Sequence, residues 1–169
     1  MKWKDIPQFV RDGSYCVDQP LDHLQHVLDR YAGMGLQMEP DFQRGHVWTD
    51  KQSSRYMEFL LRGGQSNRII YFNFPGWMNS YEGDFVLVDG LQRLTACLRF
   101  LKNELPAFGL LFNEFEGRFP MTLTLRFNVN TLKTRAEVLQ WYLDMNSGGV
   151  VHTTAELDKV RALLAAEYA

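Results

Sequence analysis

The chain has 169 residues, of which 46% are hydrophobic and 22% are charged, and its formal net charge is −2. This length and composition predict one globular domain, residues 1–169, with a sizeable core. The charge excludes a general attraction to nucleic acid or membrane, so any DNA contact must come from a local basic cluster. No apolar run could span a bilayer, residues 1–7 are unlike a signal peptide, and two distant cysteines favour a reducing compartment. We therefore expect a soluble, cytoplasmic protein.

The chain opens with a predicted strand and a predicted helix. Residues 14–17 favour a short strand, and apolar residues at helical spacing predict a helix over residues 21–33. His23 and His26 lie three positions apart on this helix. Because no third ligand is evident nearby, we expect both at the surface rather than in a metal site.

A loop rich in aromatic residues follows at residues 38–49 and contains the pair Gln43-Arg44. By itself this pattern favours a loop held by aromatic packing over a binding loop. Residues 49–52 then match the capping-box pattern, in which a threonine and a glutamine satisfy each other's backbone amides. A second helix is predicted to begin there.

Residues 85–95 concentrate polar side chains where a predicted strand meets a predicted helix. Four apolar residues, 85–88, are typical of a short buried strand, and leucines at helical spacing follow. Between them lie Asp89, Gln92 and Arg93, at a helix N-terminus whose unpaired N–H groups favour anions.

Each of these three side chains has a chemistry that suits a site. Arg93 is suited to phosphate, Gln92 could orient a water or a base edge, and Asp89 could cap the helix, accept a proton or hold a metal. The alternative is that the junction is only a well-capped turn, since Asp-Gly is a common turn.

The rest of the chain alternates strands, loops and helices. Its predicted elements are a strand at 68–74 beside the strand at 85–88, a helix from 91 to about 103, an ordered loop at 104–120, a half-buried strand at 121–127, helices opened by capping boxes at 134–137 and 153–156, and a helix-stop turn at 146–149.

Three motifs in this order resemble those of the N-terminal domain of GmrSD-type restriction endonucleases. They are Pro40-Asp41-Phe42-Gln43-Arg44-Gly45-x-Val47-Trp48, Asp89-Gly90-Leu91-Gln92-Arg93-Leu94-Thr95, and Met145-Asn146-Ser147-Gly148-Gly149 followed by Thr154-x-Glu156. The resemblance covers roughly residues 15–165. It implies an α+β fold related to ParB and sulfiredoxin, for which we expect a small mixed sheet of four or five strands flanked by about five helices.

The resemblance also implies one shared pocket, with Gln43 and Arg44 facing Gln92 and Arg93. We expect it where the 40–48 loop, the 89–93 junction and the 146–149 turn meet. The implied catalytic residues are Asp89, Gln92 and Arg93, with Asp89 as the candidate Mg²⁺ ligand. The implied nucleotide- or phosphate-binding residues are Gln43, Arg44, Gly90 and Asn146. Arg99 joins them as a candidate because helical spacing puts it on the same face as Gln92 and Thr95, apart from the leucine stripe, where it either adds positive charge beside the site or is simply solvated.

Two departures from the family pattern matter for function. Leu91 replaces a glutamine that is usual in the central motif, and nothing resembles the HNH-type nuclease domain of GmrSD enzymes. No Walker-type Gly-x-x-x-x-Gly-Lys is present, which excludes a P-loop enzyme.

The resemblance implies nucleotide binding and phosphoryl transfer, as an NTP hydrolase or a DNA-nicking enzyme in restriction or phage–host conflict. The alternative is a non-catalytic module that binds nucleotide, DNA or a partner such as a separately encoded nuclease or defence protein, and that could be phage-encoded and interfere with host defence. A purely structural protein is the third reading, which three ordered motifs disfavour. The retained Asp89, Gln92 and Arg93 favour the enzyme, narrowly.

Overall fold

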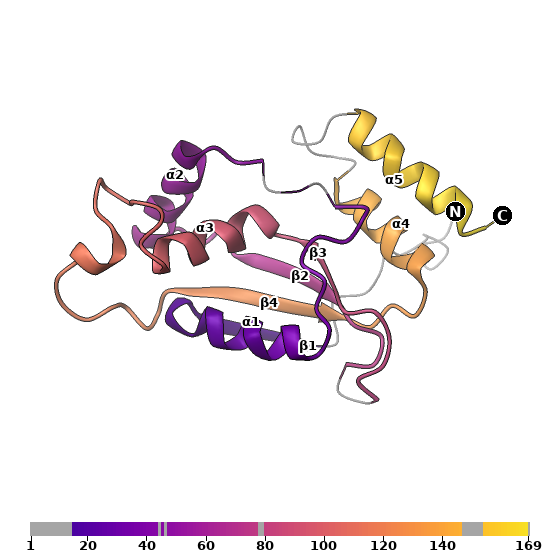
Figure 1. Cartoon of the computed structure of the whole chain (residues 1–169), viewed down its shortest axis with the longest axis horizontal. Coiled ribbons are helices and arrows are strands. Elements are labelled where there is room, and N and C mark those ends of the chain that lie inside the picture. The colour runs from indigo at the N-terminus through magenta and orange to yellow at the C-terminus, as the bar shows by residue number, and fades with distance from the viewer. Residues whose placement is uncertain (1–14, 44, 46, 78–79, 147–153, 169) are drawn as a thin grey trace, which may run out of the picture.

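The computed structural model describes residues 15–43, 45, 47–77, 80–146 and 154–168. In this part of the chain a four-stranded sheet has the order β1-β4-β2-β3 (Figure 1). The strands are β1 (Tyr15–Pro20), β2 (Ile69–Asn73), β3 (Val86–Asp89) and β4 (Thr124–Asn130). β2 runs parallel to β4, whereas β1–β4 and β2–β3 are antiparallel pairs, so the sheet is mixed as expected.

Five α-helices accompany the sheet within the described residues, which confirms the α+β prediction. They are α1 (Leu24–Gly33), α2 (Asp50–Leu61), α3 (Leu91–Leu101), α4 (Arg135–Asn146) and α5 (Thr154–Ala166). Short 3₁₀ turns precede α1 at Leu21–His23 and lie in the long loop at Phe112–Glu114. None of these helices is both long and apolar enough to cross a membrane.

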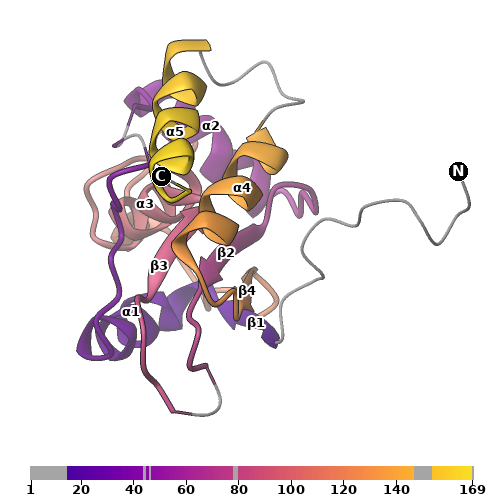
Figure 2. The same cartoon turned by 90° about the vertical axis from the view of Figure 1, so that its right-hand side faces the viewer.

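The short strand β3 contributes to two hydrophobic clusters because successive side chains of a strand point to opposite faces. Leu87 packs in the larger cluster, together with apolar residues of α1, α2 and α3. Val86 and Val88 pack in the second cluster, with α4 and α5. Figure 2 shows α4 and α5 side by side, with α4 next to β3. The continuous apolar run of this strand is therefore explained by burial on both faces.

Both capping boxes that lie in the described residues form as predicted. Thr49 and Gln52 exchange hydrogen bonds at the start of α2. Thr134 and Glu137 do so at the start of α4. The third predicted box includes Thr153, which lies outside the described residues.

β4 differs from its predicted position by three residues toward the C-terminus. The alternation of apolar and polar residues predicts a strand at residues 121–127. In the structure the Met121 side chain is 56% exposed, and the pairing of β4 with β2 extends to Asn130. Asn128 and Asn130 are buried although asparagine is disfavoured in strands. The shift arises because β4 is a central strand, so the register of β1 and β2 determines its bounds.

Candidate functional site

The site is built around Gly90, which joins β3 to α3. Its φ is +109°, and a Cβ there would lie 2.6 Å from Ile70 Cδ1 and 3.2 Å from Ile70 Cα, so glycine suits both conformation and space. Gly90 is itself the N-cap of α3, and no side chain caps the helix. The structure therefore corrects one option for Asp89, which does not cap α3. The first amides of the helix are left without a side-chain partner.

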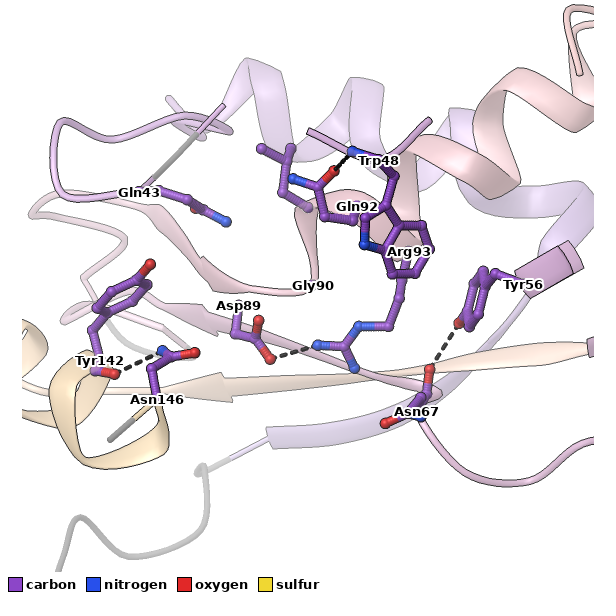
Figure 3. A pocket seen from close by; sticks show the side chains of 11 residues that line it. Gln43, Trp48, Tyr56, Asn67, Asp89, Gly90, Gln92, Arg93, Tyr142 and Asn146 are labelled. Atoms are coloured by element: carbon purple, nitrogen blue, oxygen red, sulfur yellow. Dashed lines mark hydrogen bonds and ion pairs between the residues drawn. The ribbon is translucent and has the colours of Figure 1, made fainter. Parts of the chain in front are cut away.

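Asp89 instead forms an ion pair with Arg93, one turn further along (Figure 3). Arg93 Nη2 contacts Asp89 Oδ2, and Nη1 donates a hydrogen bond of 2.7 Å to the carbonyl oxygen of Ile69. The Arg93 side chain is 15% exposed and that of Asp89 is 36% exposed. These contacts hold the guanidinium in a defined orientation. The N–H donors that they do not use remain available to a ligand.

Gln92 connects the two Gln-Arg motifs. Its Oε1 accepts hydrogen bonds from the amides of Val47 (2.9 Å) and Trp48 (3.0 Å). Its Nε2 donates to the carbonyl of Gly45 at 3.0 Å. Both acceptor positions of the amide oxygen are thus used by the loop backbone. Through these bonds Gln92 positions the backbone of Gly45, Val47 and Trp48. One N–H of its Nε2 is left over, so the expectation that Gln92 orients a water or a base edge stays a prediction.

The first motif contributes Gln43 to the same cavity. The Gln43 Oε1 atom is buried and has no hydrogen-bond partner among the described residues. Arg44 lies outside the described residues, so its predicted place opposite Arg93 stays a prediction.

The C-terminal end of α4 forms the wall of the cavity opposite α3. Asn146, its last residue, donates from Nδ2 to the carbonyl of Tyr142 at 2.7 Å. The Tyr142 ring packs against Phe42 with centroids 5.3 Å apart, which joins α4 to the first motif. Residues 147–149 of the predicted turn lie outside the described residues.

Together these segments enclose a cavity of about 300 Å³. It is lined by Gln43, Trp48, Tyr56, Asn67, Asp89, Gly90, Leu91, Gln92, Arg93, Tyr142 and Asn146. It thus lies where the 40–48 loop, the 89–93 junction and the end of α4 meet.

Tyr56 and Asn67 line the cavity although neither belongs to any of the three motifs. The Tyr56 hydroxyl donates to the carbonyl of Asn67 at 2.7 Å, and its ring packs against Trp48 with centroids 5.5 Å apart. Burial raises the pKa of Tyr56 well above its usual range, so it stays a neutral donor. Asn67 has a left-handed φ of +55°, but no sequence pattern indicates that it faces the junction.

Arg99 was expected beside the site, and the structure corrects this. It does not line the cavity, and its Nη1 pairs with Asp50 Oδ1 at 2.8 Å. Arg99 lies six residues beyond Arg93, which corresponds to about 9 Å further along the helix. Helical spacing identified its face of α3 but not its distance from the N-terminus.

The described residues were compared with the requirements of a metal site formed by protein side chains alone. The described residues contain no group of three His, Cys, Asp or Glu side chains that could hold an ion. His23 and His26 are exposed on their helical segment, as expected. Asp89 is the one carboxylate among the residues that line the cavity.

Comparison with known proteins places the chain in a family. Residues 24–124 match the family model described as GmrSD restriction endonuclease, N-terminal domain. Among curated proteins none matches. A solved structure of the C-terminally truncated chromosome-partitioning protein ParB from Caulobacter crescentus, complexed with CTP-γ-S, matches with a TM-score of 0.43 and 14% identity. That match covers 92% of this chain and 65% of the ParB chain. Because the family model matches more than half of its residues, the chain belongs to the GmrSD restriction endonuclease N-terminal domain family.

Proposed function

We propose that this domain binds a nucleotide in the cavity at the N-terminus of α3. The observation that carries the proposal is the meeting of two anion-binding features in one cavity. The uncapped first turn of α3 offers backbone N–H groups, and the guanidinium of Arg93 is held beside it. A helix N-terminus and a fixed arginine fork are suited to phosphate.

The other walls are suited to the rest of a nucleotide. Trp48 and Tyr142 supply aromatic surface on which a base can stack, and Asn67 and Gln43 supply amide groups that can hydrogen-bond a sugar or a base. The cavity of about 300 Å³ lies at the lower end of the size range of small-molecule sites.

The charge balance of the site favours a nucleotide that carries Mg²⁺. Arg93 is already paired with Asp89, so among the described residues that line the cavity the phosphates would meet one cation and one anion. Mg²⁺ is commonly bound by one or two carboxylates plus substrate phosphates. Asp89 would be such a carboxylate, and the cation would offset its repulsion of the phosphates.

Phosphoryl transfer, as NTP hydrolysis or DNA nicking, is the second candidate function. It is favoured by Asp89 Oδ1, which receives no hydrogen bond from the described residues and could accept a proton from an attacking water. It is disfavoured by Gln92, whose amide oxygen is occupied by the loop. The geometry therefore supports binding better than turnover. In either case the family suggests a role in restriction or phage–host conflict, with DNA and a separately encoded nuclease as candidate partners.

The test compares two arginines of the same helix. We would measure the affinity of the four NTPs with Mg²⁺ by calorimetry, and phosphate release with and without DNA, for wild type, Arg93→Ala and Arg99→Ala. Loss of charge-assisted hydrogen bonds worth about 1.5–3 kcal/mol should weaken binding to Arg93→Ala by roughly 10- to 150-fold. Arg99→Ala, which removes an ion pair outside the cavity, should bind like wild type.

Arg93→Ala also leaves Asp89 unpaired, so Arg93→Lys and a thermal melt serve as further controls. A folded Arg93→Lys variant should still bind more weakly than wild type, because lysine lacks the planar fork. Absence of NTP binding to wild type, or equal losses in Arg93→Ala and Arg99→Ala, would contradict the proposal.

A further inference from the structure

A second, smaller cavity lies at the end of the sheet where β2 and β4 begin and β1 ends. Its volume is about 190 Å³, below the range of sites for whole small molecules, so it suits a single charged group. Residues 67–69 separate it from the first cavity, because Asn67 lines the first cavity whereas Arg68 and Ile69 line the second. The other lining residues are Asp18, Gln65, Thr124 and Arg126.

The register of the sheet brings two arginines to this cavity. β2 and β4 are parallel neighbours in which Ile69 lies opposite Arg126, and the amide of Arg126 donates to the carbonyl of Arg68 at 2.9 Å. On the other side of β4, Asp18 of β1 lies opposite Arg126. Two cations and one anion are thus found among the described residues that line the cavity, so its net charge is positive.

Arg68 carries a charge that no carboxylate of the described residues neutralises through a direct contact. Its Nε donates to the carbonyl of Gly64 at 2.6 Å, and its Nη1 lies 3.5 Å from the carbonyl oxygen of Thr124. These neutral partners hold the partly buried guanidinium in place, and within the described residues the N–H groups of Nη2 stay unused. A guanidinium held in this way is suited to a phosphate.

Arg126 supplies further donors beside it. Its Nε and Nη2 atoms contact the two carboxylate oxygens of Asp18 at 2.7 and 3.1 Å, which leaves Nη1. The hydrogen bond from Arg126 lowers the pKa of Asp18, and the positive charge of Arg68 adds to this effect, so both guanidinium groups act on the same place. Because an ion pair this exposed contributes little to stability, Arg126 can turn from Asp18 to a ligand at low cost.

From this arrangement we infer that Arg68 and Arg126 bind a phosphate group at the end of the sheet, apart from the nucleotide cavity. Two sources share this chemistry, namely the backbone of a nucleic acid and a small phosphate compound. The formal net charge of the chain is −2, so a nucleic-acid contact needs a local basic cluster of this kind. The inference does not rest on the proposed nucleotide site.

The experiment uses the full chain without NTP and two probes. Inorganic phosphate would be titrated while NMR follows the Nε–H signals of the arginines, so that binding at Arg68 is distinguished from binding at Arg93. A fluorescein-labelled DNA duplex would be titrated by fluorescence anisotropy at several salt concentrations. Arg126→Ala is compared with Arg161→Ala as the matched control. Arg161 forms an ion pair of the same kind, with Asp158 at 2.6 Å, and is 53% exposed against 52% for Arg126.

Phosphate should shift the Arg68 signal in wild type and in Arg161→Ala. Arg126→Ala should weaken this binding by about fivefold or more, and Asp18→Asn, which removes the repelling carboxylate, should strengthen it by a similar factor. If the source is DNA, Arg126→Ala should also make the slope of log K against log salt less steep by about one, whereas Arg161→Ala should not. An effect of Arg126→Ala on phosphate but not on DNA assigns the site to a small phosphate compound.

Asp18→Asn combined with Arg126→Gln keeps the net charge of wild type and leaves no unpaired carboxylate in the cavity. This double variant should still bind phosphate more weakly than wild type. Equal affinities of Arg126→Ala and Arg161→Ala for both probes would overturn the inference, as would a wild type that shows neither a phosphate-dependent Arg68 signal nor DNA binding. Neither result concerns NTP binding beside Arg93, so the proposed function would stand.

Discussion

The two walls of the cavity are built in different ways. The α3 wall comes from a contiguous motif and one loop, and its polar side chains mainly bind each other or nearby backbone. Gln92 holds the loop backbone, and Asp89 holds Arg93. The α4 wall consists of Tyr142 and Asn146, which lie beyond the residues matched by the family model. The side chains of the central motif therefore tie the α3 wall to β2 and to the loop that follows Gln43, whereas Asn146 in the second wall bonds within its own helix.

Contacts through the first motif connect the two walls. Arg135 of α4 contacts the Asp41 carboxylate at 2.8 Å, and Lys159 of α5 donates to the Asp41 carbonyl at 2.7 Å. Val138 of α4 packs in the same hydrophobic cluster as Phe42. The loop that carries Gln43 is thus anchored to α4 and α5 on one side. On the other side, Gln92 of α3 holds the continuation of this loop at Gly45, Val47 and Trp48.

The largest expected effect is on the α3 wall, from Gly90→Ala. The substitution combines a left-handed backbone with a Cβ 2.6 Å from Ile70 Cδ1, so we expect the free energy of unfolding to fall by about 2–5 kcal/mol. Gly63→Ala is the matched control, because Gly63 has φ +83° but no heavy atom lies within 4 Å of where its Cβ would be. It should lose only about 1–2 kcal/mol. If denaturant titrations give equal losses of unfolding free energy for Gly90→Ala and Gly63→Ala, the close approach of Gly90 to Ile70 of β2 is unimportant.

A smaller and more local effect is expected from Gln92→Leu. Removing the amide leaves the N–H groups of Val47 and Trp48 without their acceptor, so both should exchange with deuterium roughly tenfold faster. Gln52→Leu removes a different acceptor, that of the Thr49 amide, and should accelerate exchange at Thr49 instead. If exchange at Val47 and Trp48 does not change in Gln92→Leu, Gln92 does not position the loop.

The smallest expected effect concerns the start of α4, the helix that carries the second wall, and the pH dependence of its cap. Hydrogen bonds from the Thr134 backbone, then from its side chain and from Lys133, lower the pKa of Glu137 below its usual 4.5. A carboxyl with a lowered folded-state pKa stabilises the fold above its unfolded value, and this contribution is lost as pH falls through the folded value. Wild type should therefore lose stability on acidification below pH 4.5 relative to Glu137→Gln, which does not titrate. Parallel acid titrations of the two proteins would contradict the assigned cap.

Local patterns in the sequence predicted much of this molecule. The capping boxes at Thr49 and Thr134, the strand-to-helix junction after Val88 and the helical spacing of α3 were all predicted, because each depends on residues only a few positions apart. The three motifs indicated the family and the loop, junction and helix end that line the cavity.

Tertiary structure decided which groups in those segments are available to a ligand. Whether Gln92 faces a water or a loop, and whether Asp89 caps α3 or pairs with Arg93, depends on where distant backbone groups lie. Tyr56 and Asn67 reach the cavity, and Arg99 does not, because the register of the sheet and the docking of α2 set these distances. A periodic pattern specifies the face of an element but not what that face meets, since contacts between segments far apart in the chain arise only when the core packs.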